Sequence, residues 1–227
     1  MELKRVVITG LGALSPLGNN VADTWKAAVE GKSGAGPITH FDATLFKTQF
    51  ACEVKDFKPE EHFDRKKLRQ LDLYAQYALV AAKEAIDDAK LDSEEGVDKN
   101  RVGVVFAAGI GGLHTFEEEA GYYAINDKGP KYNPFFIPKM IADIAAGHIS
   151  IDHGFHGPNF GTVSACASSN NALVDAFNLI RLGHADAIVT GGAEAAIFPA
   201  GVGGFNSMKA LSTRNDDPVG ASRPFSG

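Results

Sequence analysis

Short apolar runs that end at glycines alternate along the chain with longer stretches in which apolar residues recur every three or four positions. The short runs are rich in valine, isoleucine and threonine, which is typical of strands buried on both faces. They predict strands over residues 5–9, 101–107, 159–165 and 186–190. The longer stretches predict helices over about 20–30, 67–90 and 138–148, and a further helix that follows Cys166 and ends near Gly183. Strands that alternate with helices indicate an α/β fold with a mainly parallel sheet covered by helices.

The periodic pattern ends near residue 210. After it, the stretch LSTRNDDPVGASRPFSG gathers proline, glycine, serine and aspartate, which favour turns. We therefore expect residues 1–210 to form one compact half and residues 211–227 to form a connection toward further chain.

Composition narrows the class of protein. A chain of 227 residues with 44% hydrophobic residues can bury a sizeable core. Its net charge of −6 gives no general attraction to nucleic acid, because phosphates repel an acidic surface. No window approaches the roughly 18 uninterrupted apolar residues of a membrane helix. Gly10, Gly12 and Pro16 also interrupt the apolar run that follows Lys4 and Arg5, so we expect a cytoplasmic protein without a membrane segment.

Two ligand-binding patterns are only partly present. Residues 10–15, GLGALS, begin like a dinucleotide fingerprint after a strand, but Ser15 replaces the third glycine, and Glu30 lies in a predicted helix instead of ending a second strand. The seven histidines form no HExxH motif, and the two cysteines form no CxxC pair. These patterns argue against a nucleotide site and predict no metal site.

The two cysteines have different settings. In QFACEVKDF, Cys52 alternates with Phe50 and Val54, which predicts the buried face of a strand and a structural thiol. In VSACASSNN, Cys166 stands where a strand gives way to a helix, so the positive end of that helix favours its thiolate. Small neighbours leave room for an acyl substrate, and the N–H of Cys166 can donate to an oxyanion. Cys166 is therefore a candidate nucleophile, with a small core residue as the alternative.

Several longer motifs resemble the β-ketoacyl-acyl carrier protein synthases, in particular the type II elongating condensing enzymes of fatty acid synthesis. They are RVVITGLGALSPLGN near the start, GIGGL at 109–113, NPFFIPKMIADIAAGHISIDHGFHGP at 133–158, VSACASS around Cys166, DAIVTGGAEAAI at 186–197, and ALSTRNDDP with ASRPF in the tail. The resemblance covers the whole chain.

The resemblance implies a fold, a reaction and partners. This family has the thiolase fold, in which two similar halves stack as α-β-α-β-α layers, and it works as a homodimer; the chain resembles the N-terminal half. Cys166 is then expected to take an acyl group from acyl carrier protein as a thioester. A malonyl-loaded carrier then loses carbon dioxide and extends the acyl chain by two carbons. The resemblance implies no metal or redox cofactor.

Other positions carry over from the resemblance alone. Those that match the acyl pocket of the family are Ile110, Phe136, Ile137 and Phe205, with ordinary core packing as the alternative. Those that match basic positions for docking the acidic carrier protein are Arg65, Lys66, Lys67, Arg69, Lys131 and Lys209, with a solvated charged face as the alternative.

The chain departs from the family pattern in two respects. Many relatives carry a histidine five residues after the cysteine, where this chain has Asn171. The two histidines with which the family promotes decarboxylation lie in motifs beyond the RPF signature, and none of the seven histidines fits them. We therefore expect residues 1–227 alone not to complete condensation. The open alternatives are a non-catalytic half for dimerisation or carrier binding, a polyketide-type ketosynthase, and a nucleotide-dependent oxidoreductase.

Overall fold

The computed structural model describes residues 3–93, 95–126 and 129–226. The chain forms two compact units, each made of two segments. The first unit comprises Met1–Ala13 and Pro59–Ala195, and the second comprises Leu14–Lys58 and Ala196–Gly227. These units do not test the expected division of the chain into residues 1–210 and 211–227, which stays a prediction.

The first unit is built on a three-stranded parallel sheet with the order β4-β3-β5. Its strands are β3 (Val102–Ala107), β4 (Asn159–Thr162) and β5 (Ala187–Gly192). Every residue of β3 is buried, as its unbroken apolar sequence requires for a central strand covered on both faces. The predicted parallel sheet is confirmed, and β5 lies at one of its edges.

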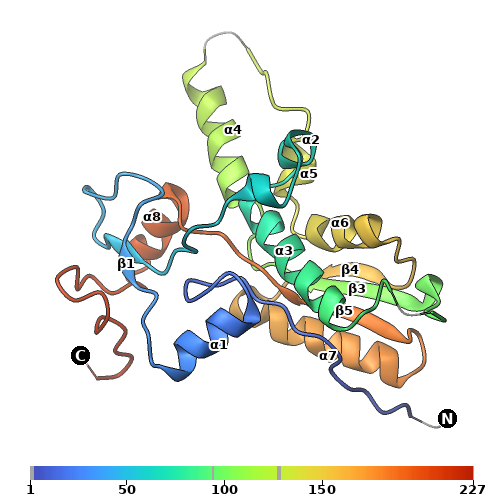
Figure 1. The fold of residues 1–227 in the computed structure, drawn as a ribbon. Coiled ribbons are helices and arrows are strands. Elements are labelled where there is room, and N and C mark those ends of the chain that lie inside the picture. Colours follow the sequence, from blue (N-terminus) through green and yellow to red (C-terminus); the bar gives the residue numbers. More distant parts are fainter. Residues whose placement is uncertain (1–2, 94, 127–128, 227) are drawn as a thin grey trace. The chain divides into compact units, whose positions relative to one another are not determined.

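Helices cover both faces of this sheet (Figure 1). Helix α7 (Ser168–Arg181) packs on one face, where Ala172 joins Val105 and Ala107 in a buried cluster. Helices α3 (Leu73–Asp88) and α6 (Ile144–His153) contact each other and pack on the other face. The remaining helical elements of the unit are η1 (Pro59–Glu61), α2 (Arg65–Leu68), η2 (Lys99–Arg101), α4 (Leu113–Ile125), α5 (Phe136–Met140) and η3 (Ala165–Ala167).

Four of the predicted elements are wrong in detail. The strand expected over 159–165 ends at Thr162, because the chain turns at Ala165. The helix expected over 67–90 is two helices, because buried Asp72 caps the start of α3 by accepting a hydrogen bond from the N–H of Tyr74. The helix expected over 138–148 is also divided, since the backbone turns extended at Ile141 between α5 and α6. Residues 5–9 form no strand with any described residue of the chain.

The second unit contains α1 (Val21–Val29), the short antiparallel pair β1 (Gly36–Pro37) and β2 (Phe50–Ala51), and α8 (Pro199–Ser207). The side chain of Asn20 caps α1, as expected for the predicted helix at 20–30. The hydroxyl of Thr48 lies 2.8 Å from Asn206 Oδ1 and 2.7 Å from the carbonyl of Ser212, so the two segments of this unit are joined by buried polar contacts.

The predicted burial of Cys52 is wrong. Cys52 is exposed, and its neighbour Glu53 is buried instead. The Glu53 carboxylate turns inward because it accepts hydrogen bonds from the N–H groups of Thr39 and His40 and from the Thr39 hydroxyl. Burial alone would raise the pKa of Glu53, but these hydrogen bonds outweigh it and hold the pKa below its ordinary value.

No helix within the described ranges is long and apolar enough to cross a membrane.

Candidate active site around Cys166

Cys166 lies in a tight turn between β4 and α7. The turn is the single 3-10 turn η3, and the cysteine side chain is exposed. Ala165, directly before it, has a φ of 52°, in the left-handed region that a residue with a Cβ rarely adopts. Such strain persists only where the surrounding contacts enforce it, and it is found most often at functional sites.

The buried hydroxyl of Ser168 enforces the conformation of this turn. Ser168 is 3% exposed, and its Oγ accepts a hydrogen bond from the N–H of Ser164 at 2.9 Å and donates one to the carbonyl of Ala165 at 2.6 Å. Asn171 Nδ2 donates to Ser164 Oγ at 2.6 Å from the next turn of α7. Asn171, at the position where many relatives have a histidine, thus stabilises the turn through the Ser164 side chain.

The predicted position of Cys166 relative to the helix is confirmed. Helix α7 begins at Ser168, two residues after the cysteine, and no side-chain hydrogen bond caps it at Ala167. The N–H of Ser168 donates to the carbonyl of Ala165, and the positive end of the helix dipole lies beside the turn. This arrangement can stabilise a thiolate and the oxyanion of a thioester under attack.

The glycine-rich loop at residues 109–112 lies against the turn. A Cβ added to Gly109 would stand 3.3 Å from the carbonyl oxygen of Ala165 and 3.0 Å from Glu194 Oε2. Gly111 has a φ of 82°. A larger side chain at either position would push the loop away, so glycine allows the loop to approach the cysteine turn closely.

Glu194 holds this loop in place. Its Oε2 accepts a hydrogen bond from the N–H of Ile110 at 2.7 Å, and its Oε1 accepts one from the N–H of Gly111 at 3.2 Å. Burial raises the pKa of Glu194, while the backbone hydrogen bonds from Ile110, Gly111 and Gly109 act in the opposite direction. Glu194 was not predicted from the sequence, because the backbone groups that it holds lie 83 and 84 residues away along the chain.

The loop also joins the cysteine turn to α5, where two of the predicted pocket residues lie. The N–H of Gly112 donates to the carbonyl of Met140 at 3.0 Å, at the end of α5. On the same helix, Phe136 is partly buried and Ile137 is 55% exposed. Ile110 itself is 44% exposed. The structure therefore connects Cys166, Ile110 and α5 through adjoining segments of the first unit. Phe205 lies on α8 in the second unit.

The predicted carrier-docking residues differ in their environments. Arg65, Lys66, Arg69, Lys131 and Lys209 are exposed. Lys67 is bound inside its own chain, since its Nζ donates to Asp152 Oδ1 at 2.6 Å and lies 3.2 Å from His148 Nδ1. Burial and the Lys67 charge lower the pKa of His148, whereas Asp152 acts in the opposite direction. Lys209 belongs to the second unit.

The histidines that lie near charges are engaged in local pairs. His153 hydrogen-bonds Asp92, His114 pairs with Glu118 at 3.3 Å, and His148 lies beside Lys67. Within the part of the chain that the structure describes, no three histidine, cysteine, aspartate or glutamate side chains are placed to hold a metal ion.

Comparison with known proteins places this arrangement in a family. Residues 3–226 match the family model of the β-ketoacyl synthase N-terminal domain. The 3-oxoacyl-[acyl-carrier-protein] synthase 2 of Synechocystis sp. is 47% identical over 226 residues, which is 99% of this chain and 54% of that protein. The protein of the same name from Staphylococcus aureus (strain COL) is 48% identical over 98% of this chain and 53% of its own length. The chain thus spans about half the length of the curated relatives it matches.

The fold comparison agrees. The crystal structure of a β-ketoacyl synthase from Burkholderia phymatum STM815 superimposes with a TM-score of 0.86 at 29% identity, over 98% of this chain and 54% of that one. The expected thiolase-like α/β fold is thereby confirmed. Since the family model covers nearly every residue, including the turn at Cys166 and the loop that Glu194 holds, the chain belongs to the β-ketoacyl synthase family and carries its N-terminal domain.

Proposed function

We propose that this chain is the acyl-accepting half of a 3-oxoacyl-[acyl carrier protein] synthase of fatty acid biosynthesis. The observation that carries the proposal is the exposed Cys166 in a strained turn directly before α7. The curated relatives named above, of which the chain spans about half, support the choice of reaction.

The first chemical step follows from this geometry. The Cys166 thiolate attacks the carbonyl carbon of an acyl thioester on the carrier protein, and a new S–C bond forms. The negative charge that develops on the carbonyl oxygen is stabilised by the Cys166 N–H. The carrier's S–C bond then breaks, and its sulfur leaves as a thiolate that takes a proton from water, so the acyl group has moved from one sulfur to another.

The second step uses the acyl-enzyme. A malonyl thioester on a second carrier loses carbon dioxide, and the freed electron pair forms a C–C bond with the acyl carbon. The Cys166 thiolate leaves, and the product is a 3-oxoacyl thioester longer by two carbons. We propose that the histidines for this step come from the part of the family's chain that residues 1–227 do not span.

The two cysteines provide the test of the first step. Both are exposed, so accessibility alone would acylate both. We expect octanoyl-N-acetylcysteamine to acylate Cys166 and to leave Cys52 free, as read by peptide mass spectrometry. As a control, iodoacetamide should label both thiols, which would show that reagents in solution can reach each of them. Equal acylation of the two, or acylation that persists in Cys166→Ala, contradicts the proposal.

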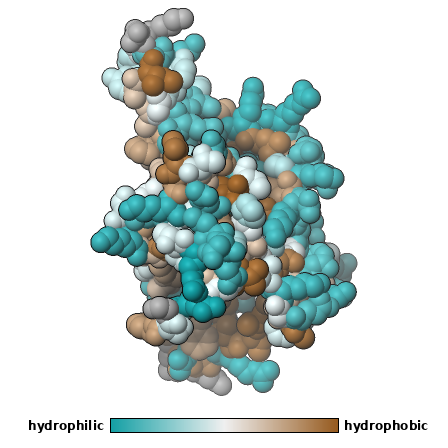
Figure 2. Space-filling model, turned by 90° about the vertical axis from the view of Figure 1, so that its left-hand side faces the viewer, coloured by the Kyte–Doolittle hydropathy of each residue, from teal (hydrophilic) through white to brown (hydrophobic). Residues whose placement is uncertain are grey.

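The α4–α5 surface supports a proposed homodimer. Tyr123, Tyr132 and Phe136 form a stacked series with centroid distances of 5.7 and 5.5 Å, and Tyr123 and Tyr132 are exposed. Figure 2 shows a small brown, hydrophobic patch near the top of the view, among paler and teal atoms. Exposed aromatic side chains are enriched at contacts between proteins. Ile125→Asp on α4 should raise the dimer dissociation constant in sedimentation, and Ile151→Asp on α6 should not.

The exposed cations of α2 are the proposed docking site for the acidic carrier. Lys67 is bound to Asp152, so we propose that the exposed Arg65, Lys66 and Arg69 provide the positive charge that attracts the carrier. Lys66→Glu should weaken binding of acyl carrier protein and reduce its salt dependence. Lys83→Glu on α3 serves as the matched control. Equal binding by the two variants would place the carrier elsewhere.

A further inference from the structure

Two buried polar residues at the start of α3 take no part in the acyl transfer proposed above. Asp72 is 2% exposed, and Tyr74 is completely buried. Asp72 Oδ1 caps α3 by accepting a hydrogen bond from the N–H of Tyr74 at 3.2 Å. A serine or an asparagine would cap a helix as well, and burying a charged carboxylate is costly unless it is well hydrogen-bonded. The cap alone therefore does not account for an aspartate at this position.

The second oxygen of Asp72 binds the start of α4. Asp72 Oδ2 accepts a hydrogen bond from the N–H of Thr115 at 3.0 Å and one from the Thr115 hydroxyl at 2.6 Å. Thr115 is 2% exposed and lies in the first turn of α4, where the N-cap residue is Gly112, which has no side chain to supply a cap. One buried carboxylate thus caps two helices and joins them through hydrogen bonds to a charged acceptor, which are the stronger kind.

Tyr74 binds the junction between α5 and α6. Its hydroxyl donates to the carbonyl of Ile141 at 2.6 Å, where the backbone turns extended between the two helices. Burial raises the pKa of Tyr74 far above its ordinary value, and the charges of Asp72, Asp143 and Glu194 act in the same direction. The hydroxyl therefore stays protonated and remains a donor at neutral pH.

These two links bracket the glycine-rich loop at residues 109–112. Helix α4 begins directly after the loop, and α5 ends at Met140, whose carbonyl accepts the hydrogen bond from the N–H of Gly112. Asp72 holds the first turn of α4, and Tyr74 holds the residue that directly follows α5. The place where the loop meets α5 is therefore fixed on both sides from α3.

We infer that Asp72 and Tyr74 are positioning residues that fix the distance between the glycine-rich loop and α5 and thereby limit the length of the acyl chain that Cys166 accepts. Ile110 on the loop and Ile137 on α5 are exposed, and they are the predicted pocket residues on the two sides of this distance. The loop and α5 separate only when a buried hydrogen bond breaks, so a long acyl chain is penalised more than a short one. The inference rests on the proposed acyl transfer.

Conservative variants separate these links from ordinary stability. Thr115→Val keeps the shape of the side chain and removes the hydroxyl, whereas Thr115→Ser retains the hydroxyl. Asp72→Ser can still cap α3, but its side chain is too short to reach α4 as well. Tyr74→Phe removes only the hydroxyl that binds Ile141.

The first readout is a ratio of rates. Butanoyl- and decanoyl-N-acetylcysteamine are each reacted with the chain, and the second-order rate of Cys166 acylation is followed by mass spectrometry. A residue that only stabilises the fold changes both rates by the same factor, because it changes the folded fraction. Thr115→Val, Asp72→Ser and Tyr74→Phe should instead raise the decanoyl-to-butanoyl ratio by about fivefold, the factor that the loss of one hydrogen bond typically brings. Thr115→Ser should keep the ratio of the parent chain.

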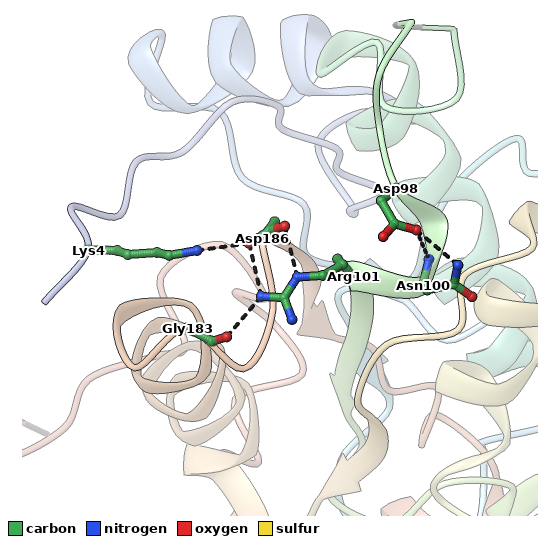
Figure 3. Close-up of polar contacts among 6 residues, drawn as sticks. All are labelled: Lys4, Asp98, Asn100, Arg101, Gly183 and Asp186. Carbon is green, nitrogen blue, oxygen red and sulfur yellow. Dashed lines mark hydrogen bonds and ion pairs between the residues drawn. The ribbon is translucent and has the colours of Figure 1, made fainter. Parts of the chain in front are cut away.

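The network at Asp186 provides a control from the other end of β5. Figure 3 shows Asp186 between Lys4 and Arg101, whose guanidinium also reaches the carbonyl of Gly183. This carboxylate also joins segments that are far apart in the chain, but it is exposed and lies just before β5, whereas the glycine-rich loop is held just beyond its end. Asp186→Asn should therefore leave the decanoyl-to-butanoyl ratio unchanged.

Amide exchange tests the links without any acyl transfer. The Gly112 amide, which donates to Met140, should exchange faster in Thr115→Val and in Tyr74→Phe, as read by NMR, and Thr115→Ser should keep the slow exchange. If neither thioester acylates Cys166 in the parent chain, the proposed function fails, and the exchange at Gly112 alone decides the inference.

Three results would overturn the inference. The first is an unchanged ratio in Thr115→Val and Tyr74→Phe, with both rates lowered by the same factor. The second is an equal rise of the ratio in Thr115→Ser or Asp186→Asn, which would show that the hydrogen bonds of Asp72 do not set it. The third is unchanged exchange at Gly112 in Thr115→Val and Tyr74→Phe.

Discussion

The two ends of β5 hold carboxylates in opposite settings. Asp186, at the start of the strand, is half exposed and pairs with Arg101 and Lys4, whose hydrogen bonds and charges hold its pKa well below the ordinary value. Glu194, just past the end of the strand, is also solvent-exposed, but its carboxylate is held against the loop backbone, and the partial loss of hydration raises its pKa. One carboxylate fastens the N-terminal segment at the surface, and the other supports a loop from within the unit.

The two ends of β5 also differ in how many of their neighbouring backbone groups are hydrogen-bonded within the unit. At the carboxyl end of the sheet, Glu194 and Ser168 satisfy the loop and the turn around Cys166 with hydrogen bonds from within the unit. At the edge of β5, by contrast, residues 5–11 and β5 line an open groove. We therefore expect the acyl-accepting site to be formed in this chain, whereas the outer edge of β5 pairs with no described residue.

The largest expected effect tests the anchor of the N-terminal segment. Gly12→Ala should lower the free energy of unfolding by about 3 kcal/mol, because its Cβ has no room against the backbone of α3. Gly121→Ala is the control: it lies in α4 with nothing within 4 Å of the added carbon, and should raise stability by up to about 1 kcal/mol. Urea unfolding measures both. If the two variants are equally stable, the segment does not rest on α3.

A smaller effect is expected at the other end of β5. Glu194→Gln retains one acceptor oxygen where the carboxylate offers two, so amide exchange at Ile110 and Gly111 should become faster. Stability should fall by about 1 kcal/mol, the net value of one hydrogen bond. Glu60→Gln, on the surface of the same unit, should leave the loop unchanged. Unchanged exchange in Glu194→Gln would show that the glycine contacts alone hold the loop.

The pH dependence of this variant has a defined sign. A carboxyl whose pKa is raised on folding stabilises the fold most below its unfolded pKa, and this contribution is lost as the pH rises through the folded value. The stability of the parent chain minus that of Glu194→Gln should therefore decrease from about pH 4.5 toward neutrality. Chemical unfolding at several pH values measures this difference, and an increase would contradict the raised pKa of Glu194.

The smallest effect is expected for Asp186→Asn, with the opposite sign of pH dependence. The pKa of Asp186 is lowered on folding, so its contribution is present above the unfolded pKa and is lost as the pH falls through the acid range. The loss at neutral pH should be slight, since exposed ion pairs are screened by water and salt. Exchange of the Lys4 amide should nevertheless become faster. A large change in stability would show that this surface network carries more of the fold than its exposure suggests.

Periodicity located the elements whose neighbours lie within this chain. The predicted strands at 101–107 and 186–190 and the helix at 20–30 agree with β3, β5 and α1 to within two residues. The strand at 5–9 failed because a strand exists only when another pairs with it. The helix at 67–90 was overextended because Asp72 also accepts hydrogen bonds from the N–H and hydroxyl of Thr115, a partner far along the chain.

The candidate site was predictable in part. The junction of a strand and a helix made Cys166 a candidate nucleophile from local sequence alone, and the structure confirms that it lies just before a helix. The supporting role of Glu194 was not visible, because its hydrogen-bond partners are 83 and 84 residues away in the chain. Lys67 was predicted as a docking residue from the resemblance to the family, and the structure shows its charge bound by Asp152, 85 residues away. Local patterns reveal which chemical groups are present, whereas long-range contacts decide which of them are free to act.

The most direct test follows both chemical steps in one experiment. Residues 1–227 are incubated with octanoyl-N-acetylcysteamine and then with malonyl-acyl carrier protein, and both the protein and the carrier are analysed by mass spectrometry. We predict an octanoyl thioester on Cys166 and no 3-oxodecanoyl product on the carrier. Absence of the thioester would contradict a complete acyl-accepting site, and formation of the 3-oxodecanoyl product would contradict the need for residues outside this chain.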